Sequence, residues 1–191
     1  VIDLGSGAGN DVFVVRAIVG DEGRVIGLDM VPDMVEKAKA NAVKLGCDNV
    51  EFHLGEIEDM PLESGIADVL VSNCVLNLVP DKITAFSEIH RVLKPGGHFC
   101  VSDIVLEGEL PTALAEAAVA YAGCVAGAQK KDEYMGTIRA AGFTEAAIRS
   151  TRQVHLPDTL LNEVLGPEEA AALKGSGFGI YSITVVGYKE A

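Results

Sequence analysis

The 191-residue sequence predicts an α/β fold, with a doubly wound, mostly parallel sheet that ends in an antiparallel pair of strands. Three observations predict it. Short apolar runs alternate with helical repeats from residue 1 to 105, as in right-handed β-α-β units. The runs at 24–29 and 67–73 have the continuous apolar character of parallel strands covered on both faces. Beyond residue 143, two strand-like stretches flank a connection punctuated by proline and glycine.

Each element follows from a local pattern. Residues 1–6 predict a strand, and valines at helical spacing predict a helix over 10–20 that Asn10 or Asp11 would cap. The same patterns predict strands at 24–29, 50–55, 67–73, 98–105, 145–156 and 180–189, and helices at 32–45, 81–93, 111–122 and 132–141. Residues 157–179 contain a short helical piece near 168–173, and the sequence leaves open whether this connection covers a site.

Composition narrows the possible partners. The formal net charge of -13 argues against nucleic acid or an anionic membrane as a partner, and no apolar run is long enough to span a bilayer. The four cysteines are widely and irregularly spaced, which predicts reduced thiols and a cytoplasmic protein. The length predicts one domain over 1–191, and the start inside a strand without Met predicts a missing N-terminal segment.

A glycine-rich turn follows the first strand. Gly5, Gly7 and Gly9 stand at alternate positions before a predicted helix, where glycine tolerates positive φ and lets a nucleotide-like ligand approach the backbone. Dinucleotide sites place their third glycine one residue later, where this chain has Asn10. The spacing therefore favours a nucleotide-like ligand and disfavours a nicotinamide cofactor.

Acidic residues stand at the carboxyl ends of the predicted strands. Asp29 follows Gly9 by 20 residues and could accept both hydroxyls of a ribose, or cap the next helix. Glu56, with the Ile57 amide, could meet an adenine, or be an exposed loop acid. Asp3 lies beneath the glycine turn and could contact a ligand ammonium or hold the turn together. Parallel topology brings these positions to one edge of the sheet.

Two cysteines suggest a soft substrate. Cys74 follows the fourth predicted strand at the expected ligand edge, and Cys124 lies between Gly123 and Gly127 in an alanine-rich helical stretch. Two thiolates beside one pocket would suit a thiophilic centre, although the sequence does not place Cys124 beside Cys74.

The other candidate ligands have plainer interpretations. Cys47 lies in a predicted surface turn, and Cys100 lies inside a strand as a small buried side chain. The four histidines lack metal-ligand spacing, and the chain contains no G-x-S-x-G or Walker motif, which disfavours hydrolysis and phosphoryl transfer.

Taken in order, residues 1–9, Asp29, Gly55-Glu56 and residues 91–97 resemble the class I S-adenosylmethionine-dependent methyltransferases, whose fold is Rossmann-like. A closer resemblance, to arsenite methyltransferases, lies in the stretches 3–11, 72–82, 94–99 and 121–128. The stretches that contain cysteine are the discriminating ones, because methyltransferases in general do not need these cysteines. The resemblance extends to about residue 143.

This resemblance implies S-adenosyl-L-methionine as cofactor, held by Gly5, Gly7, Asp29, Glu56, Ile57 and Asn73, with Asp3, Gly9 and Met30 completing the predicted set. The family often has Asp where this chain has Glu56. Cys74 and Cys124 would hold trivalent arsenic as thiolates, and residues 106–179 would contain the substrate-site helices and loops. The implied partners are arsenite, methylated arsenicals and a thiol reductant, and the cysteines that the family uses upstream of the glycine turn are absent from this chain.

Two alternatives stay open. One is a methyltransferase acting on carbon or oxygen of a small metabolite such as a quinone precursor, with structural thiols. The other is a non-catalytic module that binds the cofactor or arsenic.

Overall fold

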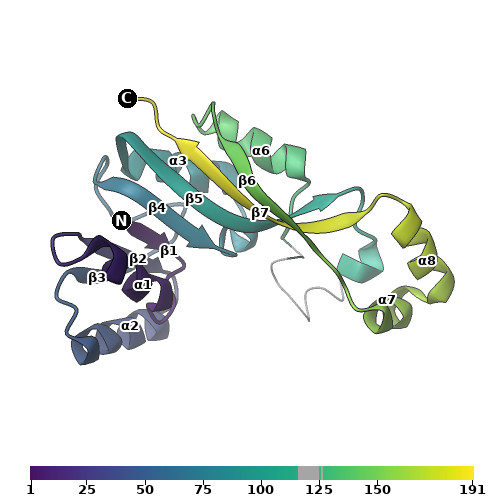
Figure 1. The fold of residues 1–191 in the computed structure, drawn as a ribbon, viewed down its shortest axis with the longest axis horizontal. Coiled ribbons are helices and arrows are strands. Elements are labelled where there is room, and N and C mark those ends of the chain that lie inside the picture. The colour runs from purple at the N-terminus through teal and green to yellow at the C-terminus, as the bar shows by residue number, and fades with distance from the viewer. Residues whose placement is uncertain (116–124, 126) are drawn as a thin grey trace.

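The computed structural model describes residues 1–115, 125 and 127–191. Its seven strands form one sheet in the order β3-β2-β1-β4-β5-β7-β6 (Figure 1). The first five run parallel, while β7 runs antiparallel to β5 and β6. The strands are β1 (Ile2–Leu4), β2 (Val25–Asp29), β3 (Val50–Leu54), β4 (Ala67–Asn73), β5 (Leu93–Glu107), β6 (Ala147–Val154) and β7 (Gly179–Tyr188). This confirms the predicted doubly wound, mostly parallel sheet with a C-terminal antiparallel pair.

Local sequence signals explain where several of the helices begin and end. The described helices are α1 (Asn10–Val19), α2 (Pro32–Leu45), the 3₁₀ helix η1 (Leu76–Leu78), α3 (Lys82–Val92), α6 (Lys131–Ala140), α7 (Asp158–Leu165) and α8 (Pro167–Gly175). Pro32 opens α2, and Gly46 ends it at φ 65°. The Asp81 carboxylate caps α3 by accepting from the Thr84 N–H at 3.1 Å. Residues 112–115 are helical, and residues 116–122 of the helix predicted there lie outside the described residues.

Two apolar layers cover the sheet. On one face, α1 and α2 pack Val12, Val35 and Ala38 against strand residues that include Val25 and Phe52. On the other face, α3 and α6 bury a larger cluster whose biggest side chains include Phe86, Phe99, Tyr134 and Phe143. The helices that connect parallel strands therefore lie on both faces, as the β-α-β pattern requires.

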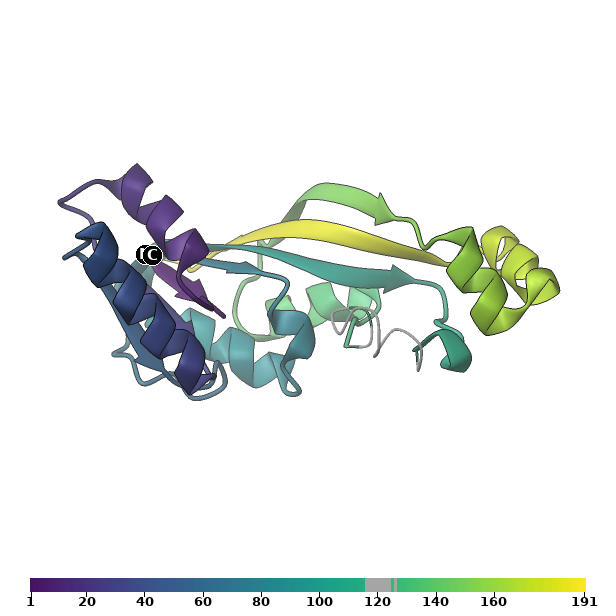
Figure 2. The same cartoon turned by 90° about the horizontal axis from the view of Figure 1, so that it is seen from below.

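The last three strands extend away from the rest of the sheet. Figure 2 shows β5, β6 and β7 reaching out as an arm that ends in α7 and α8. The β5–β7 ladder continues as far as the pair Glu107 and Gly179. None of the helices in the described part of the chain is long and apolar enough to cross a lipid bilayer.

The structure corrects several predicted boundaries. Gly9, at φ 92°, precedes α1 without a side-chain cap, so Asn10 is the first helical residue rather than a cap. Strand β5 begins at Leu93, because Leu93 pairs with Ala67 before the register shifts and His98 pairs with Val69. The spacing of Ile83, Phe86, Ile89 and Leu93 predicts that all four face the core, but Ile83 is 41% exposed.

Helix α7 was missed by the sequence analysis, and α8 is longer than its predicted helical piece. Helix α7 has an apolar face, because Leu161, Val164 and Leu165 recur at helical spacing and pack in one cluster with Ala170 and Leu173 of α8 and with Leu114. This spacing was a signal that the prediction missed. At eight and nine residues the two helices are short, so they depend on this tertiary packing for their stability.

Candidate functional site

The glycine turn joins β1 to α1 in a conformation that few other residues adopt. Gly5, Gly7 and Gly9 have φ values of 66°, 52° and 92°. The N–H groups of Gly5 and Ser6 both donate to the Leu28 carbonyl, at 2.8 and 3.0 Å, which ties the turn to β2. A Cβ atom on Gly5 would lie 2.4 Å from a methyl carbon of Val75. Position 5 therefore needs glycine both for its backbone conformation and for space.

Asp29 holds the same turn from the end of β2. One carboxylate oxygen accepts from the Gly7 N–H at 2.8 Å, and the other accepts from the Val31 N–H at 2.9 Å. Because a carboxylate offers about four acceptor sites, it can still accept hydrogen bonds from a ligand. The predicted alternatives for Asp29, ligand binding and local capping, are thus compatible.

A cavity of about 530 Å³ lies at this edge of the sheet. Its lining comes from the ends of β1, β2 and β3 and from the segment after β4. Five predicted cofactor residues line it: Gly5, Asp29, Met30, Glu56 and Ile57. Val75, Leu78, Val79 and Pro80 form an apolar wall, so the cavity combines apolar with acidic residues.

The other four predicted cofactor residues do not line this cavity. Gly7 is linked to it through Asp29, and Gly9 lies at the start of α1. Asn73 is the exposed last residue of β4. Asp3 is buried beneath the turn, and burial, assisted by the charges of Asp11 and Asp29, raises its pKa to about 7.

Cys74 follows β4 directly and has an uncommon backbone conformation. Its φ of 57° lies in the left-handed region, and it is the one non-glycine residue with positive φ in the described part of the chain. Its N–H donates to the Ser102 carbonyl of β5 at 2.7 Å. The next residue, Val75, lines the cavity. Cys124, the other predicted thiolate, lies outside the described residues.

The two cysteines interpreted as incidental lie elsewhere. Cys47 is partly buried, just after α2, and Cys100 is partly buried within β5. Burial raises the pKa of the Cys100 thiol, which disfavours its reactive thiolate form.

A buried polar pair beneath the site was not singled out from the sequence. Tyr134 of α6 donates its hydroxyl hydrogen to an Asp103 carboxylate oxygen at 2.6 Å, while the other oxygen is buried and accepts from no side chain in the described part of the chain. Burial raises the pKa of Asp103 to about 6, although Tyr134, the Asn77 backbone and the Lys82 ammonium all act in the opposite direction. The available signal was an acid within the mostly apolar stretch 99–106 of β5.

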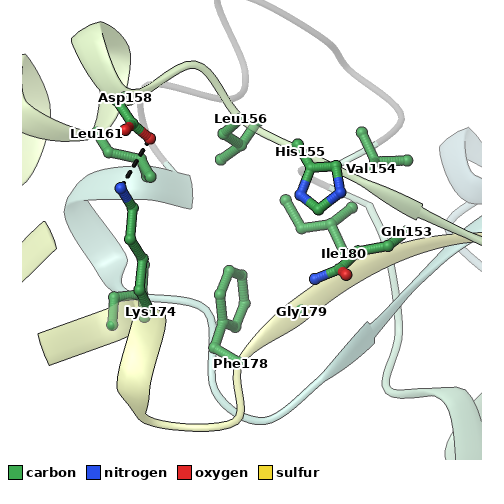
Figure 3. A pocket seen from close by; sticks show the side chains of 11 residues that line it. Gln153, Val154, His155, Leu156, Asp158, Leu161, Lys174, Phe178, Gly179 and Ile180 are labelled. Carbon is green, nitrogen blue, oxygen red and sulfur yellow. Dashed lines mark hydrogen bonds and ion pairs between the residues drawn. The ribbon is translucent and has the colours of Figure 1, made fainter. Parts of the chain in front are cut away.

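A second cavity, of about 390 Å³, lies at the far end of the arm (Figure 3). Leu156, Leu161 and Phe178 are among its apolar lining residues, and the ion pair between Asp158 and Lys174 at 2.7 Å links α7 to α8. None of its lining residues lines the first cavity. The connection 157–179 therefore borders a separate cavity and does not line the first one.

The comparisons with known proteins agree with this geometry. A family model described as a methyltransferase domain matches residues 1–142. The chain belongs to the methyltransferase domain family. Enzymes of this kind use S-adenosylmethionine, so the cofactor predicted from the resemblance is confirmed at the level of the family.

Individual relatives refine the comparison. An arsenite methyltransferase of Halobacterium salinarum is 43% identical over 148 residues, which cover 78% of this chain and 38% of that protein. A demethylmenaquinone methyltransferase of Lactococcus lactis is 41% identical over 97 residues, or 51% of this chain and 38% of that protein. The crystal structure of an arsenic (III) S-adenosylmethionine methyltransferase from Chlamydomonas reinhardtii aligns with a TM-score of 0.83 and 34% identity, covering 99% of this chain and 63% of that one. The aligned residues thus cover less than half the length of either curated relative.

Proposed function

We propose that this methyltransferase domain transfers a methyl group from S-adenosylmethionine to trivalent arsenic held by cysteine thiolates. The observation that carries the proposal is the place of Cys74, one residue before a wall of the cavity that contains the predicted cofactor residues. The arsenite methyltransferase relative and the matching arsenic methyltransferase structure support this choice of substrate.

The residues around the first cavity fit S-adenosylmethionine. The Asp29 carboxylate keeps acceptor capacity for the ribose hydroxyls, and exposed Glu56 with the Ile57 N–H suits the polar edge of an adenine. The apolar wall of Val75 and Leu78 suits the face of the base. Asp3, Gly5, Gly7, Gly9, Met30 and Asn73 complete the proposed cofactor set.

The chemistry divides between the cofactor and the thiolates. Bound S-adenosylmethionine supplies an electrophilic methyl group. Cys74 and Cys124 would each replace a hydroxyl of arsenous acid, which leaves as water with the thiol proton, and the arsenic keeps its lone pair. That lone pair would form the new bond to carbon as the methyl–sulfur bond breaks, with S-adenosylhomocysteine as the leaving group. Soft thiolates suit this soft centre better than oxygen ligands do. The transfer step needs no general base, because arsenic loses no proton, and correct positioning of two reactants contributes roughly 7–11 kcal/mol in favourable cases. A thiol reductant keeps the cysteines reduced between turnovers.

The test uses the full-length protein with S-adenosylmethionine, arsenite and excess thiol. Methylated arsenic is measured by element-specific chromatography, and cofactor affinity by calorimetry. Cys74→Ser and Cys124→Ser should each lower product formation by about 100-fold, with cofactor affinity unchanged. Cys47→Ser is the matched control and should behave as wild type. Full activity in both single variants at positions 74 and 124 would contradict the thiolate model.

A second candidate function is methylation of carbon or oxygen in a small metabolite. The relative named as a demethylmenaquinone methyltransferase favours it, since it matches 51% of this chain. The same assay separates the two, with a quinone precursor offered in place of arsenite. Methylated quinone without methylated arsenic would establish the second function, and cofactor binding without turnover on either acceptor would indicate a non-catalytic binding module.

A further inference from the structure

Beyond the end of β4, the peptide groups on that edge of β5 need other partners. The Leu106 N–H donates to the Gln129 carbonyl at 3.0 Å, while the peptide groups of Ile104 pair with a side chain. The final pair of that ladder joins Asn73 to Ser102, after which β5 continues to Glu107 without β4 beside it. The Asn77 side chain takes the place of the missing strand. Its Nδ2 donates to the Ile104 carbonyl at 2.6 Å, and its Oδ1 accepts from the Ile104 N–H at 2.9 Å. A carboxamide can satisfy both groups because it carries a donor and an acceptor, as a peptide does.

The backbone around Asn77 is held from the opposite side. Lys82 is only 8% exposed, and its ammonium donates to the carbonyls of Asn77 and Val79 at 3.1 and 2.9 Å. Gly127 packs so closely that a Cβ atom there would lie 2.1 Å from the Asn77 carbonyl oxygen. Asn77 itself is 1% exposed. The segment 74–82 is therefore attached to β5 at two points, by the Cys74 N–H on the Ser102 carbonyl and by the buried side chain of Asn77 on Ile104.

The attached segment supplies two parts of the site. It begins at Cys74, whose left-handed backbone conformation is costly for a residue other than glycine and persists only when its surroundings enforce it. It continues through Val75, Leu78 and Val79, which wall the first cavity. The proposed thiolate and the cavity wall thus lie within three residues of the Asn77 attachment.

We infer that Asn77 is a positioning residue for methyl transfer, acting through the hydrogen bonds of its side chain to Ile104. As far as the thiolate is concerned, the inference rests on the proposed function. The part that concerns the cavity wall applies to any methyl acceptor.

The first test is Asn77→Ala in the full-length protein, with Asn162→Ala on the exposed face of α7 as the matched control. We expect kcat at saturating cofactor to fall by about tenfold or more, and the backbone amides of residues 74–79 to exchange with solvent about tenfold faster. The control should leave both quantities unchanged. A kcat within twofold of wild type, or a loss of kcat without faster exchange, would overturn the inference.

The second test asks whether the donor itself matters. An ionised carboxylate in Asn77→Asp presents only acceptors to the Ile104 carbonyl, whereas a protonated one donates and accepts as the amide does. The charged groups near position 77 are Lys82 of α3 and Asp103 of β5, with the Tyr134 hydroxyl of α6 on Asp103. Position 77 is buried, and burial raises the pKa of a carboxyl group, so we expect the ratio of variant to wild-type kcat to rise several-fold as pH falls from about 8 to about 5.5. A flat ratio would overturn the hydrogen-bond role.

The amide-exchange measurement needs no arsenite. If wild-type protein methylates another acceptor, the arsenic proposal fails, and Asn77 is judged on exchange and on kcat for that acceptor.

Discussion

The carboxylate of Asp29 and the backbone N–H of Gly7 are joined by a 2.8 Å hydrogen bond that fixes the glycine turn to the end of β2. A second hydrogen bond, 2.9 Å from the Val31 N–H, holds the other carboxylate oxygen. The side chain that we propose for the ribose is therefore already oriented by the protein. This arrangement makes Asp29 both a structural and a binding residue, and the two roles can be measured separately.

Asp29→Ala should weaken binding of S-adenosylmethionine by at least about tenfold and lower the free energy of unfolding by about 1–3 kcal/mol, since two backbone donors lose their acceptor. Calorimetric titration and urea denaturation measure the two effects. Asp33→Asn, an exposed acid in the first turn of α2, is the control and should change neither quantity appreciably. Wild-type cofactor affinity in the alanine variant would exclude Asp29 from the binding site.

Gly5→Ala tests the contact between the glycine turn and the cavity wall. The new Cβ would meet Val75 at 2.4 Å, in a residue with φ 66°. Gly65 has the same φ of 66° but open space around it, so Gly65→Ala measures the backbone cost alone, about 1–2 kcal/mol. We expect Gly5→Ala to cost about 1–3 kcal/mol more by thermal denaturation and to weaken cofactor binding.

A double variant identifies the source of that difference. Val75→Ala removes the methyl groups that the new Cβ would meet, so it should restore part of the stability lost in Gly5→Ala. Equal destabilisation by Gly5→Ala and Gly65→Ala would contradict the steric account.

Much of the site could be predicted because the parallel topology brings the ends of the strands together. Each strand of the predicted β-α-β series ends at the same edge, so Gly5, Asp29 and Glu56 meet there although they are far apart in the sequence. Alternation of apolar runs with helical repeats was sufficient to predict the order of elements through β5. The final antiparallel pair was visible in the same way.

The remaining features depend on long-range contacts. No local sequence pattern predicts the role of Asn77, because that role arises only where β4 ends and β5 continues without it. Lys82 follows the α3 cap and reads as an exposed first-turn residue, yet it is buried against two carbonyls. The position of Cys124 relative to Cys74 stays a prediction, since Cys124 lies outside the residues that the structure describes.

Arg91 has a role that the sequence motif around it did not reveal. Its guanidinium forms a double hydrogen bond with Glu88, both at 2.6 Å, and also donates to the carbonyls of Leu62 and Met60 at 2.7 and 3.1 Å. The Met60 N–H in turn donates to Glu88 at 2.9 Å. This network holds the loop after β3, the start of which lines the first cavity.

Arg91→Lys should therefore destabilise the protein by about 1–3 kcal/mol, because an ammonium cannot reproduce the planar fork of donors. We also expect faster amide exchange over residues 55–62 and cofactor binding weakened by a few-fold. Arg149→Lys, at an exposed position of β6, is the control. If both variants match wild type in urea denaturation, the network contributes nothing to this loop.

The buried acid Asp103 predicts the direction in which stability changes with pH. Burial raises its pKa to about 6 in the folded protein, whereas an unfolded aspartate has a pKa of about 3.9. Between these values the folded state binds more protons than the unfolded state. The free energy of unfolding should therefore fall as pH rises from about 4 to about 6, and the loss persists above that range. The pKa of Asp3 is raised to about 7 in the folded protein, so this residue also lowers the free energy of unfolding as pH rises, up to about pH 7.

Asp103→Asn isolates the contribution of this residue, since the amide oxygen can still accept from Tyr134 but cannot ionise. Urea denaturation from about pH 4.5 to about pH 7.5 should show a loss of stability smaller by about 2 kcal/mol than in wild type, while the loss that Asp3 causes persists. Asp132→Asn, exposed in the first turn of α6, should keep the wild-type profile. If the free energy of unfolding changes with pH in the same way in wild type and in Asp103→Asn, ionisation of Asp103 does not destabilise the folded protein.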